Sequence, residues 1–268
     1  MELIVEYINY LESNNVLSAN SLRLYKRDLL DFDKFWNDKF ETTDFKELSG
    51  LHLDKFRIWV LNGGGSTASV NRKLTALRGL WNWLREQGTV ERDPFVEIVR
   101  ASQFRNKEAS ILSSEEISQL LDSKELDLKS RMILELMYAT GIRIGELTKL
   151  TLPDIDLDSQ VITIAKQGRY RERVVPFNNL TKEYLEEYIE ENGLSDNNAL
   201  LLNKQGEAVS EREVFRLVRE AAKTAGLETK LSPSIIRNSF VKHMLENGAH
   251  EVLVRDLIGQ KTLDQVRP

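Results

Sequence analysis

The 268-residue sequence contains no cysteine, 3 histidines and 5 prolines. The absence of cysteine excludes disulfides, a thiolate nucleophile and cysteine-ligated zinc. The histidines, His52, His243 and His250, are too few and too widely spaced along the chain to indicate a metal site. We therefore predict that the protein holds no metal ion.

Long hydrophobic runs are also missing. No stretch reaches the roughly 20 apolar residues that a membrane-spanning helix requires. The N-terminal residues Met-Glu-Leu-Ile-Val-Glu lack the basic start and the small-residue cleavage site of a signal peptide. We expect a cytoplasmic protein with no membrane partner. Its hydrophobic content of 41% and its length allow two domains of ordinary size.

Positive charge is not in excess. The formal net charge is −5, with 16 Lys and Arg against 16 Asp and Glu in residues 1–110, and 21 against 26 in residues 111–268. An acidic balance argues mildly against a nucleic-acid partner, but the local distribution of charge decides whether a surface binds DNA. The composition therefore neither supports nor excludes a DNA-binding protein.

Residues 1–100 are predicted to form a helical bundle, because their apolar residues recur at helical spacing. The expected helices span about 2–12, 18–36, 49–61 and 67–87. The last of them carries Arg72, Lys73 and Arg78 beside its apolar stripe. These side chains are either an ordinary charged exterior or a basic face that follows a DNA backbone.

A polar stretch without periodicity, residues 101–110, is predicted to link this bundle to a second domain, residues 111–268. Ser113-x-x-Glu116 is typical of a capping box at the start of a helix. The second domain is predicted to be mainly helical with one small β-hairpin, formed by residues 161–164 and 173–176. Its helices are expected at about 114–122, 126–139, 143–150, 180–191, 210–225, 234–246 and 250–258.

The stretch Ala139-Thr-Gly-Ile-Arg143-Ile-Gly-Glu-Leu places one arginine between two predicted helices. A guanidinium fixed at such a junction can bind a phosphate through two parallel hydrogen bonds. Alone the signal is weak, because most arginines after a glycine turn are solvated or salt-bridged. It gains weight from Lys166 in the hairpin and from Arg237 in a later helix, which can share the same task.

Taken together, three stretches resemble the tyrosine recombinases, the phage-integrase and Xer-like family. The first is the box around Arg143. The second is Ile164-Ala-Lys166-Gln-Gly168, followed by Arg171-Glu-Arg-Val-Val-Pro176, and the third is Leu231-Ser-Pro-Ser234-Ile-Ile-Arg237-Asn-Ser-Phe. Residues 1–100 are similar to the core-binding, SAM-like domain of that family, and residues 111–268 to its catalytic-type domain.

The resemblance implies a site-specific recombinase or integrase that closes around duplex DNA and breaks and rejoins strands through a 3′-phosphotyrosine. It implies that Arg143 and Arg237 stabilise the two non-bridging phosphate oxygens. Lys166 would protonate the departing 5′-oxygen as general acid. The basic residues Arg72, Lys73 and Arg78 would contact DNA from the first domain. The family's reaction needs neither a metal nor ATP.

The sequence also departs from the family pattern. Ser234 stands where the family usually has His, and Gln260 where His or Trp is usual. The nucleophilic tyrosine would fall near position 269, just past Pro268, so we expect residues 1–268 not to cleave DNA by themselves. The tyrosines of the second domain are out of register and are interpreted as core or surface aromatics: Tyr138, Tyr170, Tyr184 and Tyr188.

Three interpretations stay open. The chain is an active recombinase whose tyrosine lies beyond residue 268, or a catalytically inactive relative that acts as a DNA-binding accessory or regulatory protein. A helical interaction protein that no longer binds DNA is the third, and only the acidic composition favours it. We expect a monomer in free solution that joins a partner recombinase, or forms a tetramer, on DNA.

Overall fold

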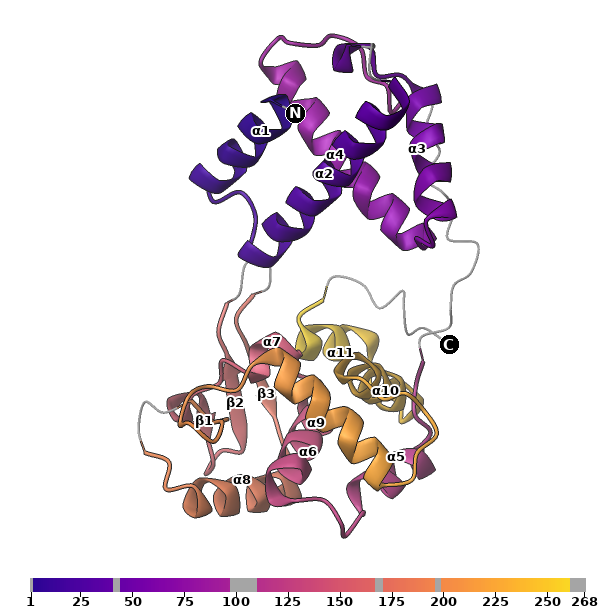
Figure 1. Cartoon of the computed structure of the whole chain (residues 1–268). Helices are drawn as coiled ribbons and strands as arrows, with labels where there is room; N and C mark the ends of the chain where they lie inside the picture. The colour runs from indigo at the N-terminus through magenta and orange to yellow at the C-terminus, as the bar shows by residue number, and fades with distance from the viewer. Residues whose placement is uncertain (1, 41–43, 97–109, 167–170, 196–198, 261–268) are drawn as a thin grey trace. The chain divides into compact units, whose positions relative to one another are not determined.

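The computed structural model describes residues 2–40, 44–96, 110–166, 171–195 and 199–260. The chain divides into two compact units, Met1–Arg105 and Asn106–Pro268, and Figure 1 draws the helices and strands of each. The predicted linker, residues 101–110, lies outside the described residues except for Ser110. Its role as a linker stays a prediction.

The first unit is a small helical bundle with a largely aromatic core. α1 and α3 each contact the central pair α2 and α4. Phe32, Phe35 and Phe56 are among its fully buried side chains, and the indole Nε1 of Trp81 donates to the carbonyl oxygen of Arg92 at 2.7 Å. The elements are α1 (Glu2–Ser13), α2 (Ala19–Phe40), the 3₁₀ turn η1 (Phe45–Glu47), α3 (Gly50–Asn62) and α4 (Thr67–Glu86).

The second unit packs helices around the buried helix α6, which contacts α8, α9 and α10 (Figure 1). Its elements before the sheet are α5 (Ser114–Leu121), α6 (Leu128–Thr140), α7 (Ile144–Leu147) and η2 (Leu152–Asp154). The strands are β1 (Ile155–Asp156), β2 (Val161–Ile164) and β3 (Arg173–Pro176). The helices that follow are α8 (Asn179–Glu191), α9 (Glu211–Thr224), α10 (Pro233–Glu246) and α11 (Glu251–Ile258).

The sheet is antiparallel in the order β1-β2-β3. In the register of β2 and β3, Ile162 faces Val175 and Ile164 faces Arg173. Ile162, Ile164 and Val175 are buried, so one face of the hairpin joins the core in the alternating pattern expected of a half-buried sheet. The hairpin loop that carries Lys166 leaves the sheet next to the pair formed by Ile164 and Arg173.

The prediction of a mainly helical fold with a small sheet is confirmed. The capping box of α5 is also confirmed, because Ser113 N donates to Glu116 Oε2 at 2.8 Å and Glu116 N donates to Ser113 Oγ at 3.2 Å. The helix expected to reach residue 150 ends at Leu147 instead. Lys149 N and Leu150 N donate to carbonyls only three residues back, so the chain leaves the helix through a turn. The two-residue strand β1 was not predicted, because it is too short to alternate.

Within the residues that the structure describes, no helix is both long and apolar enough to cross a membrane.

Candidate functional site

Arg143 lies at the junction of α6 and α7. The C-cap of α6 is Gly141, whose φ of 58° is left-handed, and a Cβ there would lie 2.5 Å from Cδ1 of Phe240. The turn therefore requires glycine. Arg143 then caps α7, since its backbone N donates to Oε2 of Glu146 at 2.8 Å and its Nη1 donates to Oε1 at 2.9 Å. The turn and the cap together fix where the guanidinium lies.

Arg237, on α10, is buried. Its Nη1 donates to the carbonyl oxygen of Gly141, and its Nη2 donates to that of Ile258 at 2.6 Å. Gly141 precedes Arg143 by two residues, so the second arginine stretch contacts the backbone of the first. The tertiary structure thus brings together the two arginines that the sequence singled out.

The last turn of α11 and its cap gather three guanidinium groups. The carbonyls at the C-terminus of a helix lack intrahelical partners and carry partial negative charge, so they attract cations. Here the carbonyls of residues 257–259 accept, in order, from Nε of Arg173 at 2.7 Å, Nη2 of Arg237 at 2.6 Å and Nη2 of Arg143 at 3.3 Å. Segments more than 100 residues apart therefore meet at one helix end.

Glu146 is the acidic member of this site and is 3% exposed. Arg173 donates to both carboxylate oxygens, with Nη1 2.8 Å from Oε1 and Nη2 2.7 Å from Oε2. Burial raises the pKa of Glu146, but the hydrogen bonds and positive charges of Arg173 and Arg143 outweigh it and leave the pKa below its ordinary value. We call Arg143, Arg173, Arg237 and Glu146 the arginine cluster. With three guanidinium groups and one carboxylate, it carries a charge of +2 and suits an anionic ligand.

The other predicted catalytic positions lie around the cluster and are exposed. Lys166 lies two residues after the end of β2. Ser234 stands at the second residue of α10, one turn before Arg237. Gln260 follows the cap of α11, and its backbone N donates to the carbonyl oxygen of Arg255 at 3.1 Å. Of the segment between β2 and β3, the structure describes residues 165–166 and 171–172, and residues 167–170 lie outside the described part of the chain.

The described tyrosines of the second unit serve packing and hydrogen bonding. Tyr188 is 2% exposed, Tyr184 lies under the guanidinium of Arg131, and the hydroxyl of Tyr138 lies 2.9 Å from Nδ1 of His243. Burial raises the pKa of Tyr138, so its hydroxyl stays protonated at neutral pH. Tyr170 lies outside the described residues.

The basic residues predicted for the first unit make internal contacts. Arg72 and Lys73 both pair with the buried Asp28, and Lys73 also pairs with Asp31. The side chain of Lys73 is only 9% exposed. Arg78 donates from Nη2 to the carbonyl oxygen of Phe95 at 3.2 Å, and its guanidinium lies over that ring. Their contact with DNA stays a prediction.

A basic stripe on α9 was not predicted. Its members are exposed and recur at positions i, i+4, i+7 and i+11, which places them on one face of the helix. They are Arg212, Arg216, Arg219 and Lys223. They line a shallow groove together with the 41%-exposed ring of Phe215. The spacing of the basic residues on this amphipathic helix was the signal that could have found them.

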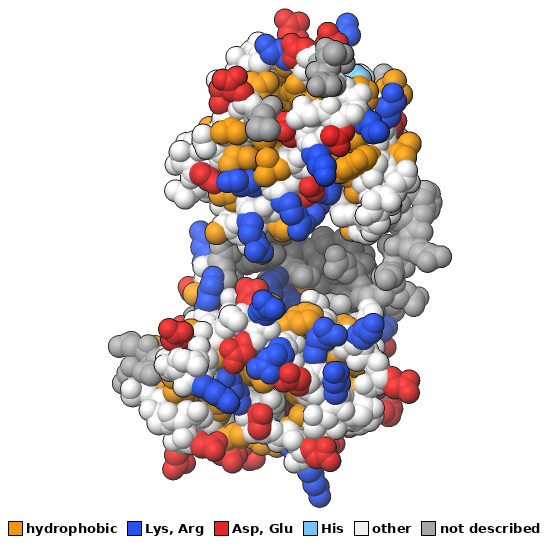
Figure 2. Space-filling model, viewed as in Figure 1, with side chains coloured by type: hydrophobic (Ala, Val, Ile, Leu, Met, Phe, Trp, Pro, Cys, Tyr) orange, Lys and Arg blue, Asp and Glu red, His pale blue; other side chains and the backbone are white. Residues whose placement is uncertain are grey.

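A second stripe of exposed basic residues at helical spacing lies on α2. Arg23, Arg27 and Lys34 are exposed at positions i, i+4 and i+11, with the 44%-exposed Leu30 between them. Figure 2 shows blue side chains along the course of α2, and blue interspersed with red on the face of the second unit that α9 crosses. We call these two sets the α2 stripe and the α9 stripe. In both, basic and apolar side chains are exposed together.

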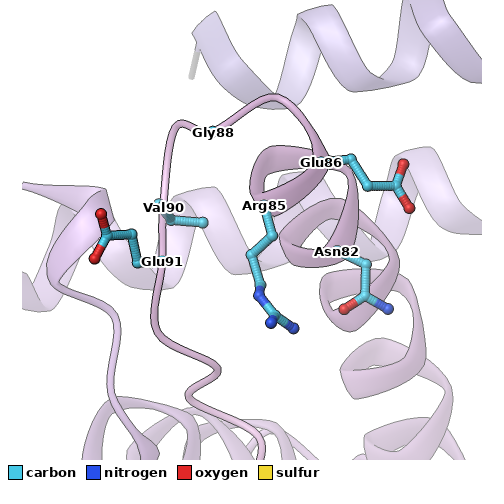
Figure 3. Close-up of a pocket in the computed structure, with 6 residues that line it drawn as sticks. All are labelled: Asn82, Arg85, Glu86, Gly88, Val90 and Glu91. Atoms are coloured by element: carbon cyan, nitrogen blue, oxygen red, sulfur yellow. The ribbon is translucent and has the colours of Figure 1, made fainter.

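A separate hollow lies at the end of α4 in the first unit (Figure 3). It is open and lined by mixed side chains, among them Asn82, Arg85 and Glu86. Arg85 Nη1 lies 3.9 Å from the carboxylate of Asp93. Nothing in this hollow resembles a reaction centre. Across the described ranges, no group of three His, Asp or Glu side chains could hold a metal ion.

Family models match both units. Residues 110–267 match the Phage integrase family, and residues 4–88 match the Phage integrase, N-terminal SAM-like domain. Tyrosine recombinase XerD of Oceanobacillus iheyensis is 31% identical over 265 residues, covering 96% of this chain and 89% of that protein. Tyrosine recombinase XerC of Lactobacillus delbrueckii subsp. bulgaricus is 31% identical over 275 residues, covering 98% and 92%.

Solved structures share the fold. A lambda integrase dimer bound to a COC′ core site matches with a TM-score of 0.81 at 15% identity, over 99% of this chain and 93% of that one. XerH site-specific recombinase bound to palindromic difH substrate, a post-cleavage complex, matches with a TM-score of 0.79 at 23% identity, over 92% and 74%. The Phage integrase match, residues 110–267, spans the positions of the arginine cluster. The chain belongs to the phage integrase family, among the Xer-like tyrosine recombinases.

Proposed function

We propose that this protein is a site-specific DNA recombinase or integrase that cleaves and rejoins strands of duplex DNA through a 3′-phosphotyrosine. The observation that supports this most is the arginine cluster, in which the last turn of α11 holds Arg143 and Arg237 on adjacent carbonyls. A phosphodiester under attack builds negative charge on two non-bridging oxygens. Two guanidinium groups in a site of charge +2 can stabilise that charge without reorganising.

The proposed reaction proceeds in one displacement at phosphorus. A tyrosine oxygen forms a bond to phosphorus while the bond from phosphorus to the 5′-oxygen breaks. Lys166 gives its proton to the departing 5′-oxygen, and Arg143 and Arg237 bind the two non-bridging oxygens. The free 5′-hydroxyl of another strand reverses the step. We propose that the nucleophile is a tyrosine near position 269, the register in which the resemblance to the family places it.

DNA would contact both units through the α2 stripe and the α9 stripe. Basic side chains along a helix can follow phosphates, and release of counterions then makes the affinity salt-dependent. In this proposal residues 1–100 bind DNA, residues 101–110 link, and residues 111–268 bind and react. The lambda integrase and XerH structures named above are complexes with DNA, which supports duplex DNA as the partner.

A second function has specific support. Ser234 and Gln260 are exposed beside the arginine cluster, and neither can transfer a proton near neutral pH as an imidazole does. A relative that keeps the phosphate-binding arginines but lacks these groups could bind its site without cutting. We therefore keep a DNA-binding accessory or regulatory role as the alternative.

Cleavage decides between the two. The full-length gene product is incubated with a nicked duplex that loses its cleaved end, and the covalent adduct is resolved on a denaturing gel. We expect an adduct that disappears in Arg237→Ala and in Lys166→Ala. Tight, site-specific binding without any adduct would favour the accessory role, and a protein that binds no duplex at all would contradict both.

DNA binding is tested with a matched pair of variants. Arg216 pairs with Glu220 on α9 and Lys182 pairs with Glu186 on α8, each at i, i+4 on an exposed surface. Fluorescence anisotropy against salt should show that Arg216→Gln weakens binding and lowers the salt slope by about 1, as expected for one lost phosphate contact. Lys182→Gln should leave both unchanged. Equal effects of the two variants on affinity and salt slope would contradict the proposal that the α9 stripe contacts DNA.

The oligomeric state completes the proposal. We propose that the protein is a monomer in free solution and assembles with further recombinase subunits on DNA. Light scattering with and without a duplex carrying the site measures both states. A stable tetramer without DNA would contradict this part.

A further inference from the structure

Arg173 is the arginine of the cluster to which the proposed function assigns no contact with the phosphate. We propose that Arg173 is a positioning residue that holds the hairpin of Lys166 in register with the arginine pair. The inference rests on the proposed function, because it concerns the general acid of that reaction. It adds a role for a residue that touches neither the tyrosine nor the DNA.

The backbone of Arg173 sits where the loop begins. Arg173 faces Ile164 in the last pair of the β2–β3 ladder, and Lys166 follows Ile164 by two residues. Two extended residues span at most about 7 Å. The backbone of the general acid therefore lies within about 7 Å of a strand pair of which Arg173 is one half.

The side chain of Arg173 joins that strand pair to the rest of the site. It is 7% exposed and makes a two-pronged contact with Glu146 at 2.8 and 2.7 Å. Its Nε donates to the carbonyl oxygen of Leu257 at 2.7 Å. Glu146 also accepts from Arg143, and the carbonyl after Leu257 accepts from Arg237. Arg173 thus shares Glu146 with Arg143 and binds the carbonyl next to the one that Arg237 binds.

Stability alone is a weak reason for this arrangement. Removing two charges from water costs so much that a buried ion pair is often no better than apolar residues of the same volume. What the pair does supply is a defined orientation, because two parallel hydrogen bonds align the planar guanidinium with the carboxylate. Lysine cannot reproduce three donors in one plane, so it cannot hold the hairpin in the same way.

The surroundings of Arg173 confirm how closely it is held. Gly259 has a φ of 60°, and a Cβ there would lie 3.2 Å from both Cδ and Nη1 of Arg173. That distance is tighter than ordinary van der Waals contact. An alanine at residue 259 would therefore push on this guanidinium, which also joins strand β3 to the end of α11 through its bond to Leu257.

The first test separates the general acid from the phosphate contacts by changing the leaving group. The full-length protein is given two nicked duplexes, one with the natural 5′-oxygen and one with sulfur at that position. A thiolate leaves without protonation, since thiols have a pKa of about 8.5. Arg173→Gln should lose roughly 10²-fold or more in cleavage of the oxygen duplex and return to within a few-fold of wild type on the sulfur duplex.

Four other variants are compared with Arg173→Gln. Lys166→Ala should behave as Arg173→Gln does, and Arg237→Ala should be defective on both duplexes. Arg173→Lys should not restore cleavage of the oxygen duplex. Arg171→Gln changes an exposed arginine of the same loop and should cleave both duplexes as wild type does. Equal defects of Arg173→Gln on both duplexes, or no defect, would overturn the proposal.

The second test does not depend on cleavage. Hydrogen exchange of residues 161–166 and 171–176 is compared among wild type, Arg173→Gln and Arg171→Gln without DNA. We expect faster exchange at the loop end of the hairpin and at the end of α11 in Arg173→Gln only, with the amides of α6 unchanged. Unchanged exchange in the hairpin, or faster exchange throughout the second unit, would overturn the coupling. A wild type that forms no adduct would contradict the proposed function, whereas exchange would still decide this inference.

Discussion

The hydroxyl of Tyr138 lies 2.9 Å from Nδ1 of His243, a hydrogen bond between α6 and α10. Tyr138 precedes Arg143 by five residues on α6, and His243 follows Arg237 by six on α10. His243 is 8% exposed. The bond from Arg237 to Gly141 and the bond between Tyr138 and His243 are two links between α10 and the end of α6.

Removing this hydroxyl should loosen the junction. Tyr138→Phe keeps the ring and loses the hydrogen bond, leaving a buried imidazole nitrogen without that partner. We expect a loss of about 1 kcal/mol in the free energy of unfolding, measured by urea denaturation. Tyr184→Phe is the control, since the cation over its ring needs no hydroxyl. Equal losses in the two variants would mean that the Tyr138 hydroxyl contributes nothing particular.

The carboxylate of Glu146 should make the second unit acid-sensitive. Its folded pKa lies below the ordinary value of 4.5, so its charge stabilises the fold fully above pH 4.5, and this contribution is lost as pH falls through the folded pKa. Glu146→Gln should lower stability at pH 7 by roughly 3–5 kcal/mol, because it leaves two guanidinium groups without their carboxylate. The difference from wild type should shrink below pH 4.5. Denaturant titrations across pH measure it, and a constant difference would contradict the assignment.

Two left-handed glycines offer a matched comparison for the cap of α11. Gly259 has φ +60° with Arg173 3.2 Å from a Cβ, while Gly248 has φ +86° with nothing within 4 Å. Alanine should cost about 1–2 kcal/mol at either position for backbone strain. Gly259→Ala should cost more, and it should also slow cleavage. Thermal unfolding of both variants measures the difference, and equal costs would show that Arg173 can move aside freely.

We expect Lys73 to contribute to the stability of the first unit and Lys34 to contribute to DNA binding. Lys73 is buried against Asp28, with Nζ 3.1 Å from Oδ1, so Lys73→Met should destabilise the first unit by about 2 kcal/mol. Hydrogen exchange in α2 and α4 reports that loss. Lys34 is exposed in the α2 stripe, so Lys34→Met should weaken DNA binding and leave stability within about 0.5 kcal/mol. Weaker DNA binding by Lys73→Met with unchanged stability would instead support the predicted DNA contact of Lys73.

An imidazole at position 234 should accelerate cleavage. Ser234 is exposed one turn before Arg237, where a histidine can reach the same phosphate and titrate near neutral pH. We expect Ser234→His to raise the rate of adduct formation by roughly 10²-fold, the lower end of what a general acid–base group supplies. Ser114→His, at the exposed start of α5, is the control. No acceleration would mean that this position does not face the reacting atoms.

The sequence by itself determined the helices, the caps and the order of the three family stretches. These depend on residues a few positions apart. Ser113 and Glu116 cap α5 from three residues away, and the apolar stripes repeat every three to four residues. Arg143 and Arg237 could be singled out for the same reason, because each sits in a short stretch with its own pattern.

Only the tertiary structure decided how those pieces meet. Arg143 and Gly259 are 116 residues apart, and Arg173 and Leu257 are 84 apart, so no local pattern connects them. The contacts of Arg173 with Glu146 and Leu257 and the burial of Lys73 against Asp28 follow from the packing of helices and strands that come together only in the fold. A charged side chain looks the same in sequence whether it faces water or a buried carboxylate, because its surroundings are set by residues far along the chain.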